Sequence, residues 1–386
     1  MDILSKIKPS QKEEDELKSL VKDFIQKIKI KDAKAVFGGS GAKGTWLRDQ
    51  GDADIFVKFN LKKYKNKDIS KIIEKELMKK FKKAELIHGS RNYFNVNYKG
   101  FVFEVIPILD IKKASEALNI TDISPLHASW VIKKSNERIR DEIRKFKYFL
   151  KINGLYGAES YVKGFSGYAA EILIIYYKSF DNLIKNARKW KEGKIIDVEH
   201  HDSASSLNES KISPLIIIDP VQEDRNAAAA LSREKFLKLI ELSRKKISFE
   251  EKKINLEDYD LVLEIIPKKN KKDVMGAKSL KVFEYLKKNL NKFDVKDSYF
   301  KFDSRALLCF KLGKKELERY REHQGPPVKL EENVKAFLRK YKDKTYINNG
   351  RYYAKLLNKN RKFKDYVKEL LKEKHTKDGI SRIVLK

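Results

Sequence analysis

The fold is decided by residues 33–43, AKAVFGGSGAK, and by residues 52–59, DADIFVKF. The first segment reads as a short strand that ends in a glycine-rich turn. The second alternates like a half-buried strand, which places Asp52 and Asp54 on one face and apolar side chains on the other. Two carboxylates on one strand face repel each other unless a cation lies between them. Together the two segments predict a turn that binds phosphates beside a strand that binds metal ions.

The glycine turn carries the groups that a triphosphate needs. A glycine-rich turn between a strand and a helix, with Gly39 at its centre, exposes backbone N–H groups to phosphate oxygens. Ser40 can add a hydroxyl and Lys43 a positive charge. Magnesium, which prefers carboxylate and phosphate oxygens, is the expected cation.

A third carboxylate completes the pattern. Two-metal catalysis of phosphoryl transfer needs several carboxylates that hold two cations about 4 Å apart. The apolar run at 101–106, FVFEVI, supplies Glu104. A charged residue inside such a strand is rarely there for packing. Each motif alone is common, but the three in this order favour nucleotidyl transfer of the polymerase type.

Composition limits the classes of protein that remain. A chain of 386 residues is too long for one comfortable core, and 86 Lys and Arg against 55 Asp and Glu give a net charge of +31. Such a charge suits a polyanionic partner, although a lysine-rich genome explains part of it. A hydrophobic content of 41% excludes a disordered basic tail protein. The single Cys309 excludes an intramolecular disulfide and a cysteine-built metal site.

No segment reads as a signal peptide or a membrane span, so we expect a cytoplasmic protein without a membrane partner. We expect an α+β fold in three parts. A mixed α+β domain at 1–115 is followed by a mostly helical domain at 116–254 and an α+β region at 255–386. The predicted helices lie at about 10–28, 66–83, 138–152, 168–185, 233–247 and 278–290, with two or three more at the end. The predicted strands lie at 33–37, 52–59, 92–98, 101–109, 195–198, 215–218, 259–266, 297–302 and 306–311, and a polar loop lies at 200–211.

The signature G-S-x-A-x-x-T-x-L, followed by D-x-D and a third acidic strand, resembles that of the DNA polymerase beta superfamily. The chain is similar in particular to the archaeal, class I CCA-adding enzymes (tRNA nucleotidyltransferases). Further segments carry this resemblance, at 124–130 (SPLHASW), 153–168 (NGLYGAESYVKGFSGY), 186–190 (NARKW), 219–232 (DPVQEDRNAAAALS) and 349–353 (NGRYY).

The resemblance implies a polymerase-beta-like catalytic head, a helical neck that selects the base and an RNA-binding body with a shortened tail. It implies template-independent addition of C, C and A to the 3′ end of tRNA from CTP and ATP. The implied metal ligands for two Mg²⁺ ions are Asp52, Asp54 and Glu104, with Asp110 as a fallback for the third acid. Glu104 would also help to deprotonate the attacking hydroxyl. The implied nucleotide contacts are Gly39, Ser40, Lys43, His127, Lys147, Tyr156 and Arg225.

Arg225 resembles the arginine with which this family selects the base, whereas the plain structural alternative is a salt bridge to Asp224 or Glu223. The basic and aromatic C-terminal third suits the acceptor stem and TΨC corner of a tRNA. A homodimer is also suggested by the resemblance. The alternatives are a poly(A) polymerase-like enzyme, a CC-only or A-only enzyme and an inactive RNA-binding homologue.

Overall fold

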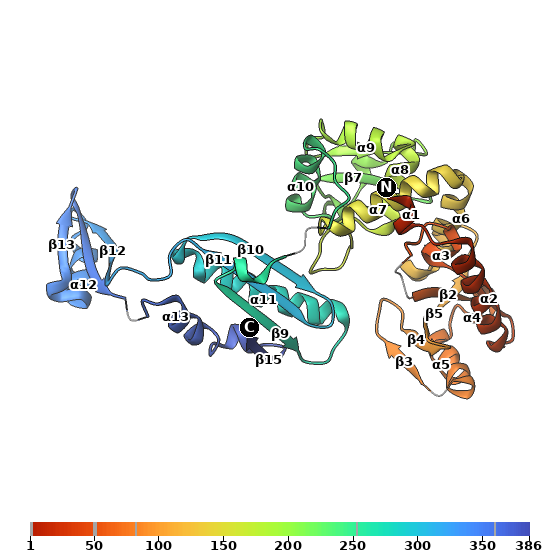
Figure 1. Cartoon of the computed structure of the whole chain (residues 1–386), viewed down its shortest axis with the longest axis horizontal. Helices are drawn as coiled ribbons and strands as arrows, with labels where there is room; N and C mark the ends of the chain where they lie inside the picture. Colours follow the sequence, from red (N-terminus) through yellow and green to blue (C-terminus); the bar gives the residue numbers. More distant parts are fainter. Residues whose placement is uncertain (1–2, 49–51, 82, 252–253, 359) are drawn as a thin grey trace. The chain divides into compact units, whose positions relative to one another are not determined.

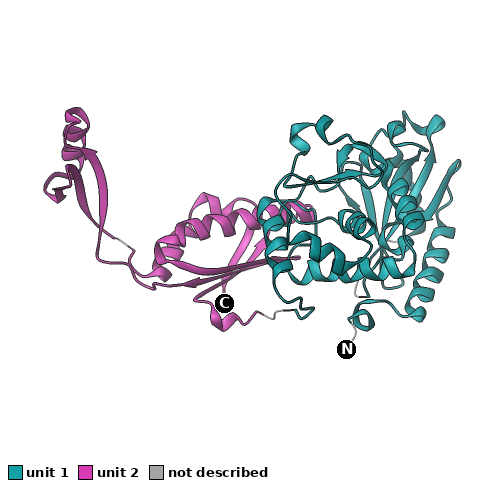
Figure 2. Cartoon of the chain, turned by 90° about the horizontal axis from the view of Figure 1, so that it is seen from above, with its two compact units in different colours: residues 1–252 teal, residues 253–386 magenta. Residues whose placement is uncertain are grey.

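A computed structural model describes residues 3–48, 52–81, 83–251, 254–358 and 360–386. The chain divides into two compact units, residues 1–252 and residues 253–386 (Figure 2). The predicted boundary at 254 lies beside the junction between the units, and the boundary at 115 falls inside the first. The three-domain division itself stays a prediction.

The first unit begins with a mixed sheet that is covered by helices (Figure 1). Its strand order is β1-β2-β5-β4-β3; β2 and β5 run parallel, and the other neighbours run antiparallel. Helix α2 begins at the predicted capping box, because Ser10 accepts from the Glu13 backbone N–H and Glu13 accepts from that of Ser10. The bounds are α1 Leu4–Ile7, α2 Gln11–Lys27, β1 Ala33–Phe37, α3 Gly39–Lys43, β2 Asp52–Asn60, α4 Leu61–Tyr64, α5 Ile69–Lys80, β3 Ala84–Ile87, β4 Tyr93–Tyr98 and β5 Phe101–Asp110.

The rest of the first unit is a helical bundle that carries a small sheet of order β6-β7-β8. Helix α8 is apolar almost all round and is buried in the centre of this bundle. Val221 packs against both this core and the core under the five-stranded sheet. The bounds are α6 Ser124–Lys134, α7 Glu137–Ile152, α8 Gly167–Tyr177, α9 Phe180–Ala187, β6 Lys194–Ile196, β7 Leu215–Asp219, β8 Gln222–Asn226 and α10 Arg233–Arg244.

The second unit contains two separate antiparallel sheets. A four-stranded sheet of order β10-β11-β9-β15 packs against α11 and α13, and a three-stranded sheet of order β12-β14-β13 packs against α12. Cys309 is fully buried in β11, as expected for a small core residue. The bounds are β9 Leu261–Pro267, α11 Lys272–Leu290, β10 Val295–Phe302, β11 Ala306–Leu312, β12 Tyr320–Pro327, α12 Glu331–Tyr341, β13 Thr345–Asn348, β14 Arg351–Leu357, α13 Phe363–Leu370, α14 Lys374–Lys377 and β15 Ile380–Leu385.

Several predicted elements were wrong in their bounds. The helix predicted at 168–185 is two helices, because Lys178 adopts a left-handed conformation and Ser179 then caps α9. The helix predicted at 66–83 is present as α5 but is shorter, because it begins after its cap Asp68 and ends at Lys80. The four strands beyond residue 319 were not predicted.

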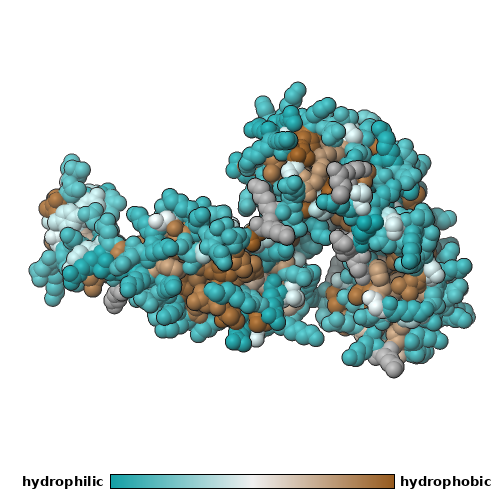
Figure 3. Space-filling view, in the orientation of Figure 1, coloured by the Kyte–Doolittle hydropathy of each residue, from teal (hydrophilic) through white to brown (hydrophobic). Residues whose placement is uncertain are grey.

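Charged and polar side chains cover most of the face shown in Figure 3, in line with a charged content of 37%. Among the described residues, no helix is both long and apolar enough to cross a membrane.

Candidate active site

A row of polar side chains crosses the otherwise apolar five-stranded sheet. Asp54 of β2 lies directly opposite Glu104 of β5, and Glu104 lies opposite Asn95 of β4. Directly paired residues on neighbouring strands point to the same face, so these three side chains share one face with Asp52, two residues before Asp54. The structure therefore brings the three carboxylates predicted from sequence onto one patch and adds the amide of Asn95.

The glycine turn lies directly against this patch. The Gly38 N–H donates to the Asp54 carbonyl oxygen at 2.8 Å, which joins the turn to β2. Gly39 has φ of +58°, and a Cβ atom there would lie 1.6 Å from Asp54 Oδ2. Only glycine permits both this backbone conformation and this close approach. The turn thus presses its backbone onto the carboxylate that the sequence identified as a metal ligand.

The electrostatics of the patch fit a cation. Burial, and then the charge of Asp52, raise the pKa of Asp54 to about 6, with Lys43 opposing the rise. Burial and the nearby charges of Glu104 and Asp54 also raise the pKa of Tyr93 to about 12. A divalent cation would relieve this concentration of negative charge, and the donors are the hard oxygens that Mg²⁺ prefers.

Other observations bear on the same fit. Asn95 Oδ1 is buried without a hydrogen-bond partner among the described residues. Across all the residues that the structure describes, no group of three Asp, Glu, His or Cys side chains lies close enough together to hold a metal ion as it stands. The residues therefore suit a metal in their chemistry, but the carboxylates still have to draw together around it.

Asp110, the fallback for the third acid, lies elsewhere. It is the last residue of β5, where it pairs with Asn60 in the strand register and forms an ion pair with Lys58 at 2.6 Å. It lies six positions after Glu104 on the same strand, which corresponds to roughly 20 Å at the usual rise. Glu104 is therefore the acid that faces Asp54.

A buried ion cluster lies beside the patch, built around Glu171 of α8. Glu171 is fully buried, and its two oxygens accept from Lys43 Nζ at 2.6 Å and from Lys147 Nζ at 2.7 Å. The Thr45 hydroxyl also donates to Glu171 at 2.7 Å, and Lys147 reaches the Thr45 hydroxyl oxygen at 3.0 Å. Two lysines that the resemblance assigned to the nucleotide are thus held together by one carboxylate, which the sequence reasoning did not single out.

The charges of this cluster do not cancel, because one carboxylate faces two lysines. Burial raises the pKa of Glu171, but the two lysines outweigh it and hold the pKa at about 2. Two cations around one anion leave a net positive charge next to Asp54, whose pKa Lys43 lowers. Tyr156 faces the same cluster, since its pKa is raised by burial and then by the charge of Glu171. A positive environment of this kind suits the phosphates of a nucleotide.

A second buried carboxylate, Asp219 at the end of β7, gathers another group. Its Oδ2 accepts from His127 Nε2 at 2.9 Å and from Arg225 Nη1, while its Oδ1 accepts from the Tyr168 hydroxyl at 3.1 Å. The rings of His127 and Tyr168 stack with centroids 4.1 Å apart. The expected structural partners of Arg225, Asp224 and Glu223, were wrong: the salt bridge goes to Asp219.

The predicted site residues therefore form three adjacent groups. Gly39, Asp52, Asp54 and Glu104 lie on the sheet, and Ser40 stands next to Gly39 in the turn. Lys43, Lys147 and Tyr156 surround Glu171, and His127 and Arg225 meet at Asp219. Helix α8 joins the last two groups, because it carries both Tyr168 and Glu171.

Sequence reasoning missed Asn95, Glu171, Asp219 and Tyr168 as members of the site. A signal for Glu171 existed, because it is the only charged residue in the apolar helix GYAAEILIIYY. Asp219 lies six residues before Arg225 in a segment already singled out, but nothing local indicated that its carboxylate faces α6 and α8.

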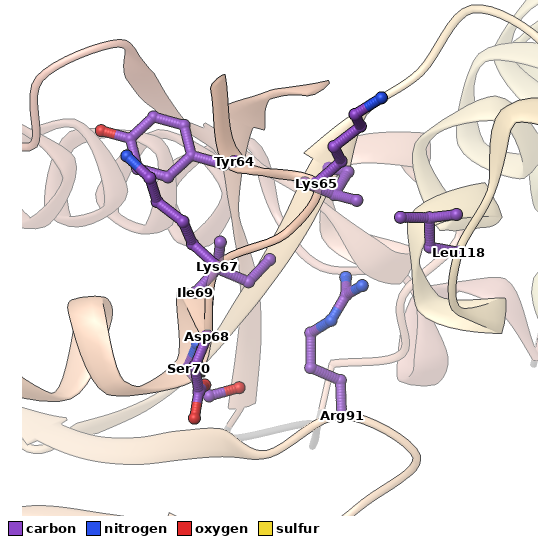
Figure 4. A pocket seen from close by; sticks show the side chains of 9 residues that line it. Tyr64, Lys65, Lys67, Asp68, Ile69, Ser70, Arg91 and Leu118 are labelled. Atoms are coloured by element: carbon purple, nitrogen blue, oxygen red, sulfur yellow. Dashed lines mark hydrogen bonds between the residues drawn. The ribbon is translucent and has the colours of Figure 1, made fainter. Parts of the chain in front are cut away.

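A separate hollow of about 140 Å³ lies in the same unit, at the far end of β5 (Figure 4). Its wall includes Arg91, whose guanidinium forms an ion pair with the buried Asp122 and donates to the Pro107 carbonyl oxygen. Asp68 in the wall accepts from two backbone N–H groups as the cap of α5. These polar groups are satisfied within the fold, so the hollow offers little to a substrate.

Three family models match the chain in order. A nucleotidyltransferase domain matches residues 17–121, the second domain of tRNA nucleotidyltransferase matches residues 141–256, and the C-terminal domain of CCA-adding enzyme matches residues 277–382.

Curated relatives agree with these models. A CCA-adding enzyme of Nanoarchaeum equitans is 39% identical over 345 residues, which cover 83% of this chain and 83% of that protein. The CCA-adding enzyme of Methanocaldococcus jannaschii is 32% identical over 390 residues, which cover 92% of this chain and 86% of that protein.

Solved structures share the fold of part of this chain. A cytoplasmic RNA terminal U-transferase matches with a TM-score of 0.50 at 14% identity, covering 65% of this chain and 97% of that one. A poly(U) polymerase matches with a TM-score of 0.51 at 13% identity, covering 63% and 90%.

Proposed function

This chain belongs to the CCA-adding enzyme family, and we propose from that membership which of its residues carry out each part of the reaction. The enzyme adds C, C and A to the 3′ end of tRNA without a template, using nucleoside triphosphates and a divalent metal. The observation that carries the residue assignment is the register of Asp54 against Glu104 beside the glycine turn.

Asp52, Asp54 and Glu104 would hold two Mg²⁺ ions, which supply charge stabilisation to the reacting phosphate and the leaving pyrophosphate. Glu104 accepts the proton of the tRNA 3′-hydroxyl while the 3′ oxygen of the tRNA forms the new bond to the α-phosphorus. The bond from the α-phosphorus to the bridging oxygen breaks, and pyrophosphate leaves with that oxygen.

The incoming CTP or ATP would lie with its phosphates toward the positive Glu171 cluster and its base toward the Asp219 group. Lys43 is 12% exposed and Lys147 only 3%, so Lys43 is the lysine that reaches the phosphates from the surface of the cluster. Ser40 and Gly39 present the turn, and Tyr156 closes the side next to Lys43. Arg225 reads the base edge, since a planar guanidinium can donate two parallel hydrogen bonds.

The three-stranded sheet of the second unit would bind the tRNA. The register places Tyr353 between Gln324 and Tyr346 on the face opposite α12, and the rings of Tyr346 and Tyr353 stack 5.7 Å apart. Lys355 on the same face lies 5.4 Å from the ring of Tyr320. Tyr320 is exposed and Tyr346 and Tyr353 are half-buried, and such tyrosines interleaved with cations suit RNA bases and phosphates. We assign this face to the TΨC corner of the tRNA, whose acceptor stem would deliver its 3′ end to the catalytic residues of the first unit. A homodimer stays a prediction, as does a cytoplasmic location.

The test is incorporation of labelled CTP and ATP, separately and together with Mg²⁺, on one tRNA transcript that ends at the discriminator base. We expect CTP alone to add two residues, ATP alone to add none, and both together to stop after C, C and A. Long A tails would contradict the proposal, and so would tight tRNA binding without incorporation. Growth that stops after two C's with both nucleotides present would restrict the enzyme to C addition.

A further inference from the structure

Asp219 is placed to control the residues that face the base without touching the base itself. Its side chain is completely buried, whereas His127 is 14% exposed and Arg225 is 27% exposed. A nucleotide can therefore reach the imidazole and the guanidinium, but not the carboxylate that holds them.

The carboxylate accepts from four donors, which lie on three different elements and one turn. His127 lies on α6, Tyr168 on α8 and Arg225 on β8, and all three donate to it. The Val221 N–H donates to Oδ1 at 3.0 Å, which closes the tight turn between β7 and β8. A carboxylate only accepts, so Nε2 of His127 must carry a proton and the ring has one orientation relative to Arg225.

The geometry also leaves Arg225 free to act. One of its five N–H groups is committed to Asp219 in the described contacts, and the side chain still reaches the surface. An arginine tethered in this way loses less rotational freedom when it binds a ligand than a free one does. A fixed donor pattern rejects a wrong base edge, whereas a mobile arginine would adapt to it.

We propose that Asp219 is the positioning residue for base selection, holding Arg225 and His127 in one fixed arrangement so that only the edges of cytosine and adenine fit. This inference rests on the proposed function, because it assumes that Arg225 reads the base. It adds that selectivity depends on a buried carboxylate that contacts no substrate.

Asp219→Asn tests the proposal directly. The amide has one acceptor oxygen and one donor NH₂ group, so it cannot accept from both pairs of donors. The turn fixes the oxygen toward Val221, and the NH₂ group then faces the N–H groups of Arg225. We expect the ratio of kcat/KM for CTP over UTP to fall at least tenfold, with tRNA binding unchanged.

Tyr168→Phe is the matched control. It removes a hydrogen bond to the same carboxylate but keeps the aromatic stack on His127 and the ion pair with Arg225. We expect its CTP over UTP ratio to stay within twofold of the unmodified enzyme. A tenfold loss in this variant as well would mean that general loosening, and not the tether on Arg225, lowers selectivity, and would overturn the proposal.

The double variant Asp219→Asn/Arg225→Ala shows whether Asp219 acts through Arg225. We expect it to be no less selective than Arg225→Ala alone, whereas a further multiplicative loss would overturn the proposal. If Asp219→Asn does not fold, Arg225→Lys keeps the ion pair but lacks the fork of donors, and unchanged selectivity in it would also overturn the proposal. Selective incorporation by Arg225→Ala would refute this inference and the base-reading role of Arg225 but not CCA addition itself, while no incorporation by the unmodified enzyme would refute the proposed function.

Discussion

Replacing Glu171 by Gln should destabilise the first unit strongly, and the effect should depend on pH. Glu171 is fully buried between Lys43 and Lys147, so the substitution leaves two largely buried cations without their anion. Removing one partner of a buried ion pair typically costs about 3–5 kcal/mol of unfolding free energy. We expect a loss of that size at pH 7.

The pH dependence follows from the lowered pKa. Glu171 has a pKa of about 2 in the folded protein and a reference value of 4.5. A carboxyl group whose pKa is lowered by folding stabilises the folded state at any pH above its unfolded-state pKa. This stabilisation is lost as the pH falls from about 4.5 toward 2. A shift of this size corresponds to about 3 kcal/mol. The difference between the unmodified protein and Glu171→Gln should therefore shrink by about 2 kcal/mol between pH 6 and pH 3, because pH 3 is still above the folded-state pKa.

Urea unfolding followed by tryptophan fluorescence measures this difference in unfolding free energy for the first unit, which contains Glu171. All three tryptophans of the chain, Trp46, Trp130 and Trp190, lie in the first unit. Glu241→Gln is the control, because Glu241 pairs with Lys245 on the exposed face of α10, and its loss should change nothing measurable. A stability loss below about 1 kcal/mol at pH 7, or parallel pH curves for the two proteins, would refute the reasoning.

Three further predictions concern the turn, the cluster and the RNA face. Gly39→Ala should lower kcat for CMP incorporation at least a hundredfold, because the new Cβ displaces the Asp54 carboxylate; Gly100→Ala, at another positive φ but with nothing within 4 Å, should not. Lys43→Met should raise the KM for CTP at least tenfold with little change in tRNA affinity, and equal KM values would remove Lys43 from the phosphate site. Tyr353→Ala should weaken tRNA binding about tenfold, since stacking on an aromatic ring contributes about 1–3 kcal/mol per base. Its kcat at saturating tRNA should stay unchanged, and unaltered filter binding would exclude the face around Tyr353.

Much of the catalytic patch could be predicted from sequence because it depends on local patterns. The alternation at 52–59 put Asp52 and Asp54 on one face, and the structure confirms this face and the strand itself. Glu104 stood out as a charged residue in an apolar strand. The pairing of β2 with β5 places it directly opposite Asp54.

The anchoring carboxylates could not be predicted in the same way. Glu171 and Asp219 act on residues 128 and 92 positions away in sequence, and only tertiary packing decides which lysine or histidine a buried carboxylate meets. Most residues of the helix predicted at 168–185 are helical, but a single left-handed residue, Lys178, divides the segment into α8 and α9. Lysine has no preference for that conformation, so the local signal for the break was only Ser179, which caps the second helix.

The most direct test of the account compares two substitutions in the catalytic patch with one outside it, at the far end of β5. Asp54→Asn, Glu104→Gln and Asp110→Asn each remove one charge from β2 or β5, and only the first two residues face each other across the register. The measurement is the single-turnover rate of CMP incorporation into a tRNA that ends at the discriminator base, with tRNA affinity measured in parallel. We predict losses of at least a thousandfold for Asp54→Asn and Glu104→Gln, an unchanged rate for Asp110→Asn and unchanged affinity in all three. Near-normal incorporation by Asp54→Asn or Glu104→Gln, or a comparable loss in Asp110→Asn, would contradict the assignment of the catalytic carboxylates.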